Sequence, residues 1–259
     1  MRVVSLCPSL TELVFHLDRG DTLVGRTKFC VHPHDGVRDV PSMGGTKNPK
    51  IERIIALAPD LVLMNEEENR REDADALREA GIECLTSMPR DTAETADMVR
   101  AIARALDAAP EGERIARDIE LRSARVSDAA RQRRPVRYAY LIWRDPWMTV
   151  NDDTFVSAML ALPGGINVFG GLPERYPIIS ADEIRDADPE LVLLSSEPFP
   201  FADRHATELE VATGLPRERF MFADGELLSW HGSRTPAGID YAERIMTAGT
   251  RDQGLVTGG

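Results

Sequence analysis

Cys30, His32 and His34 stand two residues apart in the stretch RTKFCVHPHDG. Pro33 favours an extended conformation before it, and alternate residues of an extended segment point to one side. A thiolate and two imidazoles suit Zn²⁺ or another borderline metal, with a fourth ligand from elsewhere. Because the spacing is narrow for a structural zinc site, we favour the alternative that the trio lines a pocket or consists of surface polar residues. One histidine, here or at His231, could also make a single axial contact to the metal of a bound tetrapyrrole or siderophore complex.

The chain lacks the motifs that the common hydrolases use for catalysis. Neither G-x-S-x-G nor H-E-x-x-H occurs, so we expect a protein that is not an enzyme. Acidic residues outnumber basic ones by 43 to 31, and the net charge of −12 argues against nucleic acid or an anionic membrane as the main partner. The three cysteines are widely spaced and odd in number, so we expect reduced thiols.

The first residues, MRVVSLCPSLTEL, predict an apolar strand and then a helix. They include no basic region, long apolar segment or small-residue cleavage site, so the sequence predicts no export signal in this form. Cys7 has too short an apolar segment before it for a lipoprotein anchor. Ser9 and Glu12 match a capping box, which places the expected helix start just after the strand.

Short apolar runs alternate with amphipathic stretches along the chain, and this pattern predicts the α/β class. The helix expected over residues 110–134 has a sparse apolar stripe and ends before Pro135, which suits a helix that lies across two lobes. We therefore predict an N-terminal lobe at 1–109, a connecting helix at 110–134 and a C-terminal lobe at 135–259. The expected strands lie at 2–6, 60–64, 138–143, 191–196 and 220–224.

A weak internal repeat supports two similar lobes. The segments IERIIALAPDLVLM at 51–64 and DEIRDADPELVLL at 182–194 superpose with a constant offset of 130 residues. In each segment a helix is followed by a Pro-acid turn and an apolar run typical of a buried parallel strand. The offset pairs Glu52 with Asp182, each at a helix start where the helix dipole favours a carboxylate.

The chain resembles the substrate-binding proteins of ABC importers for cobalamin and iron complexes, with the cobalamin-binding members closest. The resemblance covers nearly the whole chain. It implies two α/β lobes joined by a single long helix, the class III architecture, with the ligand in the cleft between the lobes. The motifs that carry it are SLCPSLTEL at 5–13, LVGRTKFCVHP at 23–33, NPKIERIIALAPDLVL at 48–63, LPGGINVF at 162–169 and SADEI at 180–184.

The resemblance also implies a membrane partner. In this family one carboxylate on each lobe docks on arginines of the permease, and by motif these match Glu52 in KIERI and Asp182 in SADEI. An exposed carboxylate can make a charge-assisted hydrogen bond with a guanidinium. The family usually has Glu at the second position, whereas this chain has Asp182 with Glu183 beside it. Helix capping is the alternative role for both carboxylates.

The family binds its ligand through aromatic side chains that pack on a large apolar face. The alternative for any of these aromatic residues is packing in the core. Where the cobalamin-binding members have a tryptophan, this chain has Thr46, so the resemblance supports a corrinoid or an iron chelate without choosing between them. By motif position the candidates for ligand contact are Phe29, Trp143, Trp147, Tyr176 and Trp230.

Two hypotheses for the function follow. The first is a monomeric binding protein, without an intrinsic cofactor, that captures a small metal-containing ligand for an ABC-transporter permease outside the cytoplasm. The second is an intracellular protein of the same fold that handles a metal or tetrapyrrole without a transporter. We adopt the first hypothesis on the strength of the resemblance. The predicted lack of an export signal, the expected reduced thiols and the trio of Cys30, His32 and His34 support the second as the alternative.

Overall fold

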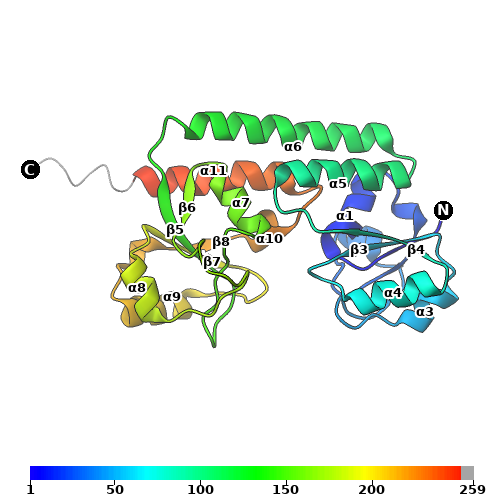
Figure 1. Ribbon diagram of the computed structural model, residues 1–259, viewed down its shortest axis with the longest axis horizontal. Helices are drawn as coiled ribbons and strands as arrows, with labels where there is room; N and C mark the ends of the chain where they lie inside the picture. The colour runs from blue at the N-terminus through cyan, green and yellow to red at the C-terminus, as the bar shows by residue number, and fades with distance from the viewer. Residues whose placement is uncertain (252–259) are drawn as a thin grey trace, which may run out of the picture. The chain divides into compact units, whose positions relative to one another are not determined.

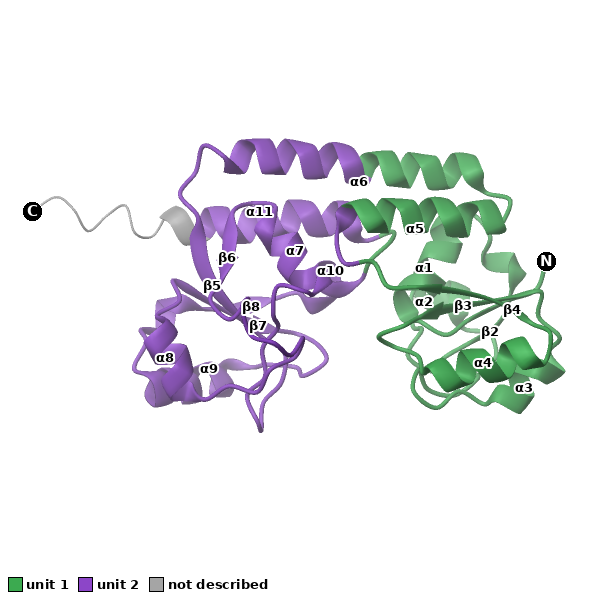
Figure 2. Ribbon diagram, in the orientation of Figure 1, with its two compact units in different colours: residues 1–89, 93–118, 231–233 green, residues 90–92, 119–230, 234–259 purple. Residues whose placement is uncertain are grey.

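Two separate parallel sheets organise the computed structural model, which describes residues 1–251 (Figure 1). Residues 1–89, 93–118 and 231–233 form one compact unit, called unit 1 here. Residues 90–92, 119–230 and 234 to the end of the described chain form unit 2 (Figure 2). Within this described part, no helix is both long and apolar enough to cross a bilayer.

Unit 1 contains a four-stranded sheet in the order β2-β1-β3-β4, in which all neighbouring strands run parallel. Figure 2 shows α3 and α4 on one side of this sheet and α1 and α5 on the other. The strands are β1 (Val3–Ser5), β2 (Leu23–Arg26), β3 (Leu61–Asn65) and β4 (Glu83–Ser87). The helices are α1 (Pro8–His16), α2 (His34–Val37), α3 (Ile51–Ala56), α4 (Arg71–Glu79) and α5 (Thr92–Ala105), with a 3₁₀ turn η1 (Gly20–Thr22).

Unit 2 repeats this topology, with the strand order β6-β5-β7-β8 and parallel pairing throughout. Its strands are β5 (Val136–Leu141), β6 (Gly165–Asn167), β7 (Leu191–Ser195) and β8 (Phe220–Ala223). Its helices are α7 (Phe155–Ala161), α8 (Ala181–Ala187), α9 (Asp203–Thr213), α10 (Gly225–Ser229) and α11 (Thr235–Arg251), with a 3₁₀ turn η2 (Arg217–Arg219).

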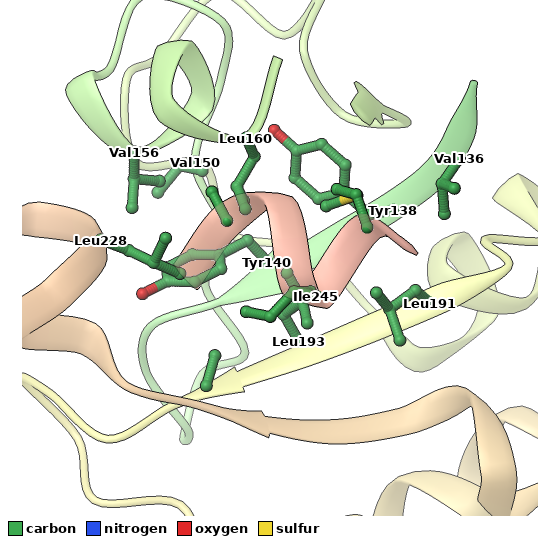
Figure 3. Close-up of a cluster of buried hydrophobic side chains, with 13 residues drawn as sticks. Val136, Tyr138, Tyr140, Val150, Val156, Leu160, Leu191, Leu193, Leu228 and Ile245 are labelled. Carbon is green, nitrogen blue, oxygen red and sulfur yellow. The ribbon is translucent and has the colours of Figure 1, made fainter. Parts of the chain in front are cut away.

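Both faces of the sheet in unit 2 are buried. On one face, Tyr138 and Tyr140 of β5 and Leu193 of β7 pack against α7, α10 and α11 (Figure 3). On the other face, Leu141 and Leu194 pack against α8 and α9. Successive side chains of a strand point to opposite faces, so a sheet covered on both sides needs nearly continuous apolar strands. This requirement explains why β5 and β7 are readily found in the sequence.

The core of unit 1 follows the same rule. Val4 of β1 and Val62 of β3 pack with Ile54 of α3 and Leu77 of α4. Val3 and Leu63, which alternate with them along the strands, are fully buried as well. The central strands of both units are therefore inaccessible on either face, and only their ends can carry exposed side chains.

Helix α6 (Ala109–Ala130) carries the chain from unit 1 into unit 2, with residues 109–118 in the first and 119–130 in the second. Within unit 1, Arg100 of α5 donates to Glu113 of α6 at 2.8 and 3.3 Å, and Arg117 donates to the same carboxylate at 3.1 Å. These two guanidinium groups lower the pKa of Glu113 to about 2. This half of α6 is thus held to α5.

A second ion-pair network holds the other half of α6 within unit 2. Arg125 donates to Asp240 and to Glu243 of α11, at 2.8 Å each, and Arg122 also pairs with Asp240. Charge-assisted pairs that share partners in this way fix helix orientation better than isolated surface pairs. The two halves of α6 therefore have separate anchors, one in each unit.

The internal repeat of the sequence is confirmed, since α3 leads into β3 and α8 leads into β7. In unit 1, the Arg2 N–H donates to Asp60 at 2.7 Å and the Asp60 N–H donates back to the Arg2 carbonyl at 2.8 Å. The guanidinium of Arg2 donates to the carbonyl of Leu57 at the end of α3 at 2.8 Å. One arginine thereby joins the start of β1 to the turn that leads into β3.

Unit 2 has the equivalent hydrogen bonds. The Arg137 N–H donates to Glu190 at 2.9 Å, the Glu190 N–H donates to the Arg137 carbonyl at 2.8 Å, and the Arg137 guanidinium donates to the carbonyl of Ala187. Ala58 and Asp188, again 130 residues apart, both have a φ of 44°. The left-handed residue ends each helix and turns the chain into its central strand.

Two local predictions need correction. Helix α1 begins at Pro8 with Cys7 at its N-cap and has no side-chain cap hydrogen bond, so the capping box predicted at Ser9 and Glu12 is wrong. Proline suits the first position of a helix because its missing N–H has no partner there anyway, and this moves the helix start upstream of Ser9. The sequence also missed β2, β4 and β6, which are all edge strands.

The repeated left-handed residue can be tested through the free energy of unfolding. We expect Ala58→Gly to stabilise the protein by about 0.5–1 kcal/mol, because relief of the left-handed strain exceeds the added entropy of the unfolded chain. The same change in the ordinary helical residue Ala76 of α4 should destabilise it by about 1 kcal/mol. Urea denaturation measures both, and a destabilised Ala58→Gly variant would contradict the assignment.

Candidate functional site

The loops that follow β5 and β7 contribute four aromatic side chains at one edge of unit 2. In open parallel sheets, ligands bind beyond the carboxyl ends of the strands, because the faces are covered by helices. β5 and β7 are neighbours in the sheet, so the loops 142–149 and 196–202 emerge side by side. These loops, together with the start of α9, are where a binding site is expected in this unit.

Four aromatic rings from these two loops pack together, and we call them the aromatic cluster: Trp143, Trp147, Phe199 and Phe201. The Trp143 and Phe199 ring centroids are 5.6 Å apart in an edge contact, and those of Phe199 and Phe201 are 4.9 Å apart. Trp147 stacks on Phe201 at 6.2 Å with an angle of 12° between the rings. Trp143 is 40% exposed and Phe201 is buried, so the cluster has an open side and a buried base.

His205, the third residue of α9, underlies the aromatic cluster. Its ring centroid is 5.0 Å from that of Phe199 and 5.7 Å from that of Phe201. Its Nδ1 accepts a hydrogen bond from the Ala202 N–H at 2.9 Å. Burial and the nearby guanidinium groups of Arg204 and Arg144 lower the pKa of His205.

Arg144 attaches the first loop to α9. Its guanidinium donates two hydrogen bonds of 2.8 Å to the carboxylate of Glu208, in a bidentate arrangement. The same guanidinium lies 5.7 Å from the centroid of the Trp147 ring. Arg144 is therefore held by its ion pair with Glu208 and by the contact of its guanidinium with the Trp147 ring.

Tyr176 belongs to a strip beside the aromatic cluster. Met148 forms antiparallel bridges with Trp143 and with Ile178, so the segment 176–178 runs next to the first loop. Tyr176 is 41% exposed and Ile178 is 65% exposed. The structure thus brings Trp143, Trp147 and Tyr176 of the predicted site onto neighbouring segments of unit 2.

Trp230 has a different setting. Its Nε1 donates to Glu197 Oε1 at 2.8 Å, and the guanidinium of Arg234 lies 4.6 Å from its ring centroid. Glu197 follows β7 and also accepts from the hydroxyl of Ser229 at 2.9 Å. Trp230 is only partly buried, so one part of the ring remains available at the carboxyl end of this sheet.

Phe29 is the one predicted aromatic contact that lies in unit 1. It follows β2, is 51% exposed, and has the Lys28 ammonium 4.8 Å from its ring centroid. The other four predicted aromatic residues lie in unit 2. Each unit therefore presents aromatic surface after its strands, with most of it in unit 2.

The structure does not bring Cys30, His32 and His34 together. Cys30 is buried and its thiol lies 3.1 Å from the hydroxyl of Thr27, and burial raises its pKa. His34 is exposed at the start of α2, beside Asp35, so the segment is not extended through His34. Across residues 1–251, the structure shows no group of three or more His, Cys, Asp and Glu side chains placed to hold a metal ion.

His231 is a buried histidine in unit 1. Its Nε2 lies 3.3 Å from the side-chain nitrogen of Asn65, which also donates to the carbonyl of Ser87. Burial lowers the pKa of His231 to about 4, although the carboxylate of Glu67 opposes the shift. The neutral ring thus acts as a hydrogen-bond acceptor at the carboxyl end of β3.

The two predicted docking carboxylates occupy the same position in their helices. Glu52 is the second residue of α3 and Asp182 is the second residue of α8, and both are exposed. Asp182 pairs with Arg185 at 2.6 Å. Glu183 instead closes a capping box with Ser180, whose N–H donates to it at 2.7 Å, so it is already used within α8.

Unit 1 also contains a cavity of about 440 Å³ between β3, β4 and α4. Arg70, Arg71 and Arg78 line it. Arg70 makes two hydrogen bonds to Asp73, and the other two arginines pair with Asp75. Asp73 and Asp75 therefore offset two of the three positive charges along this cavity.

The sequence analysis missed Phe199, Phe201 and His205. The signal that could have identified the two phenylalanines is PFPF at 198–201, which directly follows the apolar run of β7. Aromatic residues just beyond a buried parallel strand lie at the edge of the sheet where ligands bind. His205 carries no such signal, because its role depends on the way α9 folds back onto the loop.

Comparison with known proteins agrees with this architecture. A family model described as periplasmic binding protein matches residues 3–212. The chain belongs to the periplasmic binding protein family. A vitamin B12-binding protein of Vibrio cholerae serotype O1 is 23% identical over 247 residues, which cover 95% of this chain and 88% of the relative.

Two solved structures share the fold. The periplasmic vitamin B12 binding protein of Vibrio cholerae superposes with a TM-score of 0.83 at 21% identity, covering 96% of this chain and 98% of the other. A periplasmic heme-binding protein from Roseiflexus sp. RS-1 gives 0.82 at 26% identity, covering 96% and 97%. The predicted fold class of two α/β lobes is confirmed, and the chain is a substrate-binding protein rather than an enzyme.

The buried thiols give a direct test of the surroundings of Cys30. Burial raises the pKa of Cys7 to about 12 and also raises that of Cys30, so neither should form appreciable thiolate at pH 8. We expect a disulfide reagent at pH 8 to leave both unmodified in the folded protein and to label both in guanidinium chloride. Rapid labelling of Cys30 in the folded protein would contradict its burial and would favour a role as a ligand.

Proposed function

We propose that this protein captures a corrinoid or an iron chelate of the haem type and delivers it to the permease of an ABC importer. The ligand is bound as a transported substrate, and the protein needs no cofactor of its own. The observation that carries the proposal is the aromatic cluster, whose exposed side lies at the carboxyl ends of β5 and β7. A binding protein of this kind acts outside the cytoplasm.

The chemistry of the aromatic cluster suits a large flat ligand. A corrin or porphyrin ring presents an apolar face, and stacked or edge-on aromatic side chains supply contact area with little loss of side-chain entropy. Trp143, Phe199 and the neighbouring Tyr176 offer such area on unit 2, and Phe29 offers it on unit 1. These residues, with Trp147 and Trp230, are the proposed ligand contacts.

The names of related proteins give independent support for this class of ligand. One relative is a vitamin B12-binding protein and one structural neighbour is a heme-binding protein. The two ligands share a planar macrocycle with a central metal, which is the feature that an aromatic surface can recognise. The proposal therefore names the macrocycle class, and the binding measurements decide between its members.

Glu52 and Asp182 are the proposed contacts with the permease. Both carboxylates are exposed at the second position of a short helix, one in each unit, where a partner arginine could reach them. In unit 2, Glu183 is engaged in its capping box, so Asp182 is the acid we assign to docking. Asp182 now pairs with Arg185. If an arginine of the permease took the place of Arg185 as the partner, Asp182 would still be paired with one positive charge.

The contribution of Trp143 can be measured by ligand titration. We expect Trp143→Ala to weaken the binding of cyanocobalamin or haemin by at least about 1 kcal/mol, roughly fivefold, because a partly exposed ring is removed from the proposed contact surface. Leu121→Ala, which changes an exposed residue of α6, is the matched control and should leave affinity unchanged. Equal affinity of Trp143→Ala and the control would remove Trp143 from the site.

The docking role is tested by uptake in cells whose own copy of the protein is replaced by a variant. The double variant Glu52→Gln with Asp182→Asn should reduce uptake of the ligand more than tenfold while ligand affinity in vitro stays unchanged, since only two exposed charges are removed. Glu72→Gln alters the second residue of α4 and controls for loss of a helix-end carboxylate. Normal uptake by the double variant would contradict the importer assignment.

A further inference from the structure

We propose that His205 and the Arg144–Glu208 pair are positioning residues that hold the aromatic cluster in its binding shape, and that they do so only while the His205 ring is uncharged. This inference rests on the proposed function, because it concerns the surface that is proposed to contact the ligand. It assigns no ligand contact to the three residues. Their role is to join the loops after β5 and β7 to helix α9.

The first step in the argument is the hydrogen bond at the start of α9. The Ala202 N–H donates to Nδ1 of His205, the third residue of the helix, so the imidazole occupies the place that Glu or Gln takes in a capping box. Phe201 immediately precedes Ala202. The bond therefore fixes the turn that carries Phe199 and Phe201 of the aromatic cluster.

The second step concerns the protonation state that this geometry allows. Arg204 Nε lies 3.0 Å from Nε2 of His205, while the Ala202 N–H points at Nδ1, so both ring nitrogens face hydrogen-bond donors. A neutral imidazole carries one proton and can still accept at Nδ1, whereas an imidazolium has no acceptor left. Protonation must therefore break the Ala202 bond and place two N–H groups against two donors.

Two of the three charged groups around the ring oppose its protonation. Arg204 from α9 and Arg144 from the loop after β5 oppose a positive charge on His205, and Glu208 from α9 favours one. Glu208 is bound by Arg144 through two 2.8 Å hydrogen bonds, so its carboxylate is already neutralised. The Phe199 and Phe201 rings of the remaining loop pack against the imidazole, and His205 is buried.

The third step is the link to the tryptophans. Arg144 stands next to Trp143, lies over the ring of Trp147 and is clamped to Glu208, three residues after His205 in α9. Loss of the Arg144–Glu208 ion pair, or of the hydrogen bond from Ala202 to His205, would release one of the two loops that form the aromatic cluster. Because the folded pKa of His205 lies below 6.5, the positioning should persist above that pH and weaken as the pH falls further.

The test compares wild type, His205→Gln and His205→Ala by titration with cyanocobalamin and with haemin between pH 7.5 and 4.5. Glutamine can accept the Ala202 N–H but cannot take up a proton, so His205→Gln should bind like wild type at pH 7.5 and bind more tightly than wild type by roughly threefold or more at pH 4.5. The ratio of the two affinities at each pH cancels any titration of the ligand. His16→Gln, an exposed histidine of unit 1, is the control and should follow wild type.

A merely structural role predicts a different pattern, in which His205→Gln and wild type keep a constant affinity ratio at every pH, and that result would overturn the inference. His205→Ala should bind at least fivefold more weakly even at pH 7.5, and full affinity of this variant would also overturn it. If neither ligand binds, the proposed function fails, but tryptophan emission still tests the positioning. Emission should then change below pH 6.5 in wild type and stay constant in His205→Gln, and identical profiles would contradict the proposal.

Discussion

The coverage of each parallel sheet on both faces is the constraint on which the rest of this structure depends. Helices bury both sides of the central strands, so every functional side chain must lie on a loop, a helix end or an outer helix surface. The adjacent carboxyl ends of β5 and β7 are the place where two long loops meet within unit 2. The aromatic cluster occupies this place, and its base is continuous with the buried core through Phe201.

In both units the same contacts join the first strand to the turn that leads into the next central strand. An arginine at the start of the first strand binds the end of a helix, an acidic residue binds that arginine's backbone, and a left-handed residue stands between them. The proposed docking carboxylates Glu52 and Asp182 belong to this repeat, whereas most of the proposed ligand contacts lie where the two units differ. Asn65 ends β3 beside a buried histidine, whereas the equivalent Ser195 ends β7 just before the phenylalanines.

The sequence predicted the four central strands and one edge strand, β8, but missed the other three edge strands, for a physical reason. β1, β3, β5 and β7 are buried on both faces and appear as apolar runs, whereas β2, β4 and β6 have an unpaired side and partly exposed residues. In the candidate site, Trp143, Trp147 and Trp230 were predicted by their motif positions. Phe199, Phe201 and His205 were missed because their contacts depend on long-range packing. Long-range packing also buries Cys30, whereas His34 stays exposed, and the sequence did not predict this difference.

The central claim is that the aromatic surfaces recognise a metal-containing macrocycle. Calorimetric titration of the purified protein with cyanocobalamin, haemin and a ferric siderophore tests it most directly. The account predicts one-site saturation by at least one of the two macrocycles with a Kd of about 1 μM or below, and weaker binding of the siderophore. Absence of binding by both macrocycles at concentrations up to about 1 mM would contradict it.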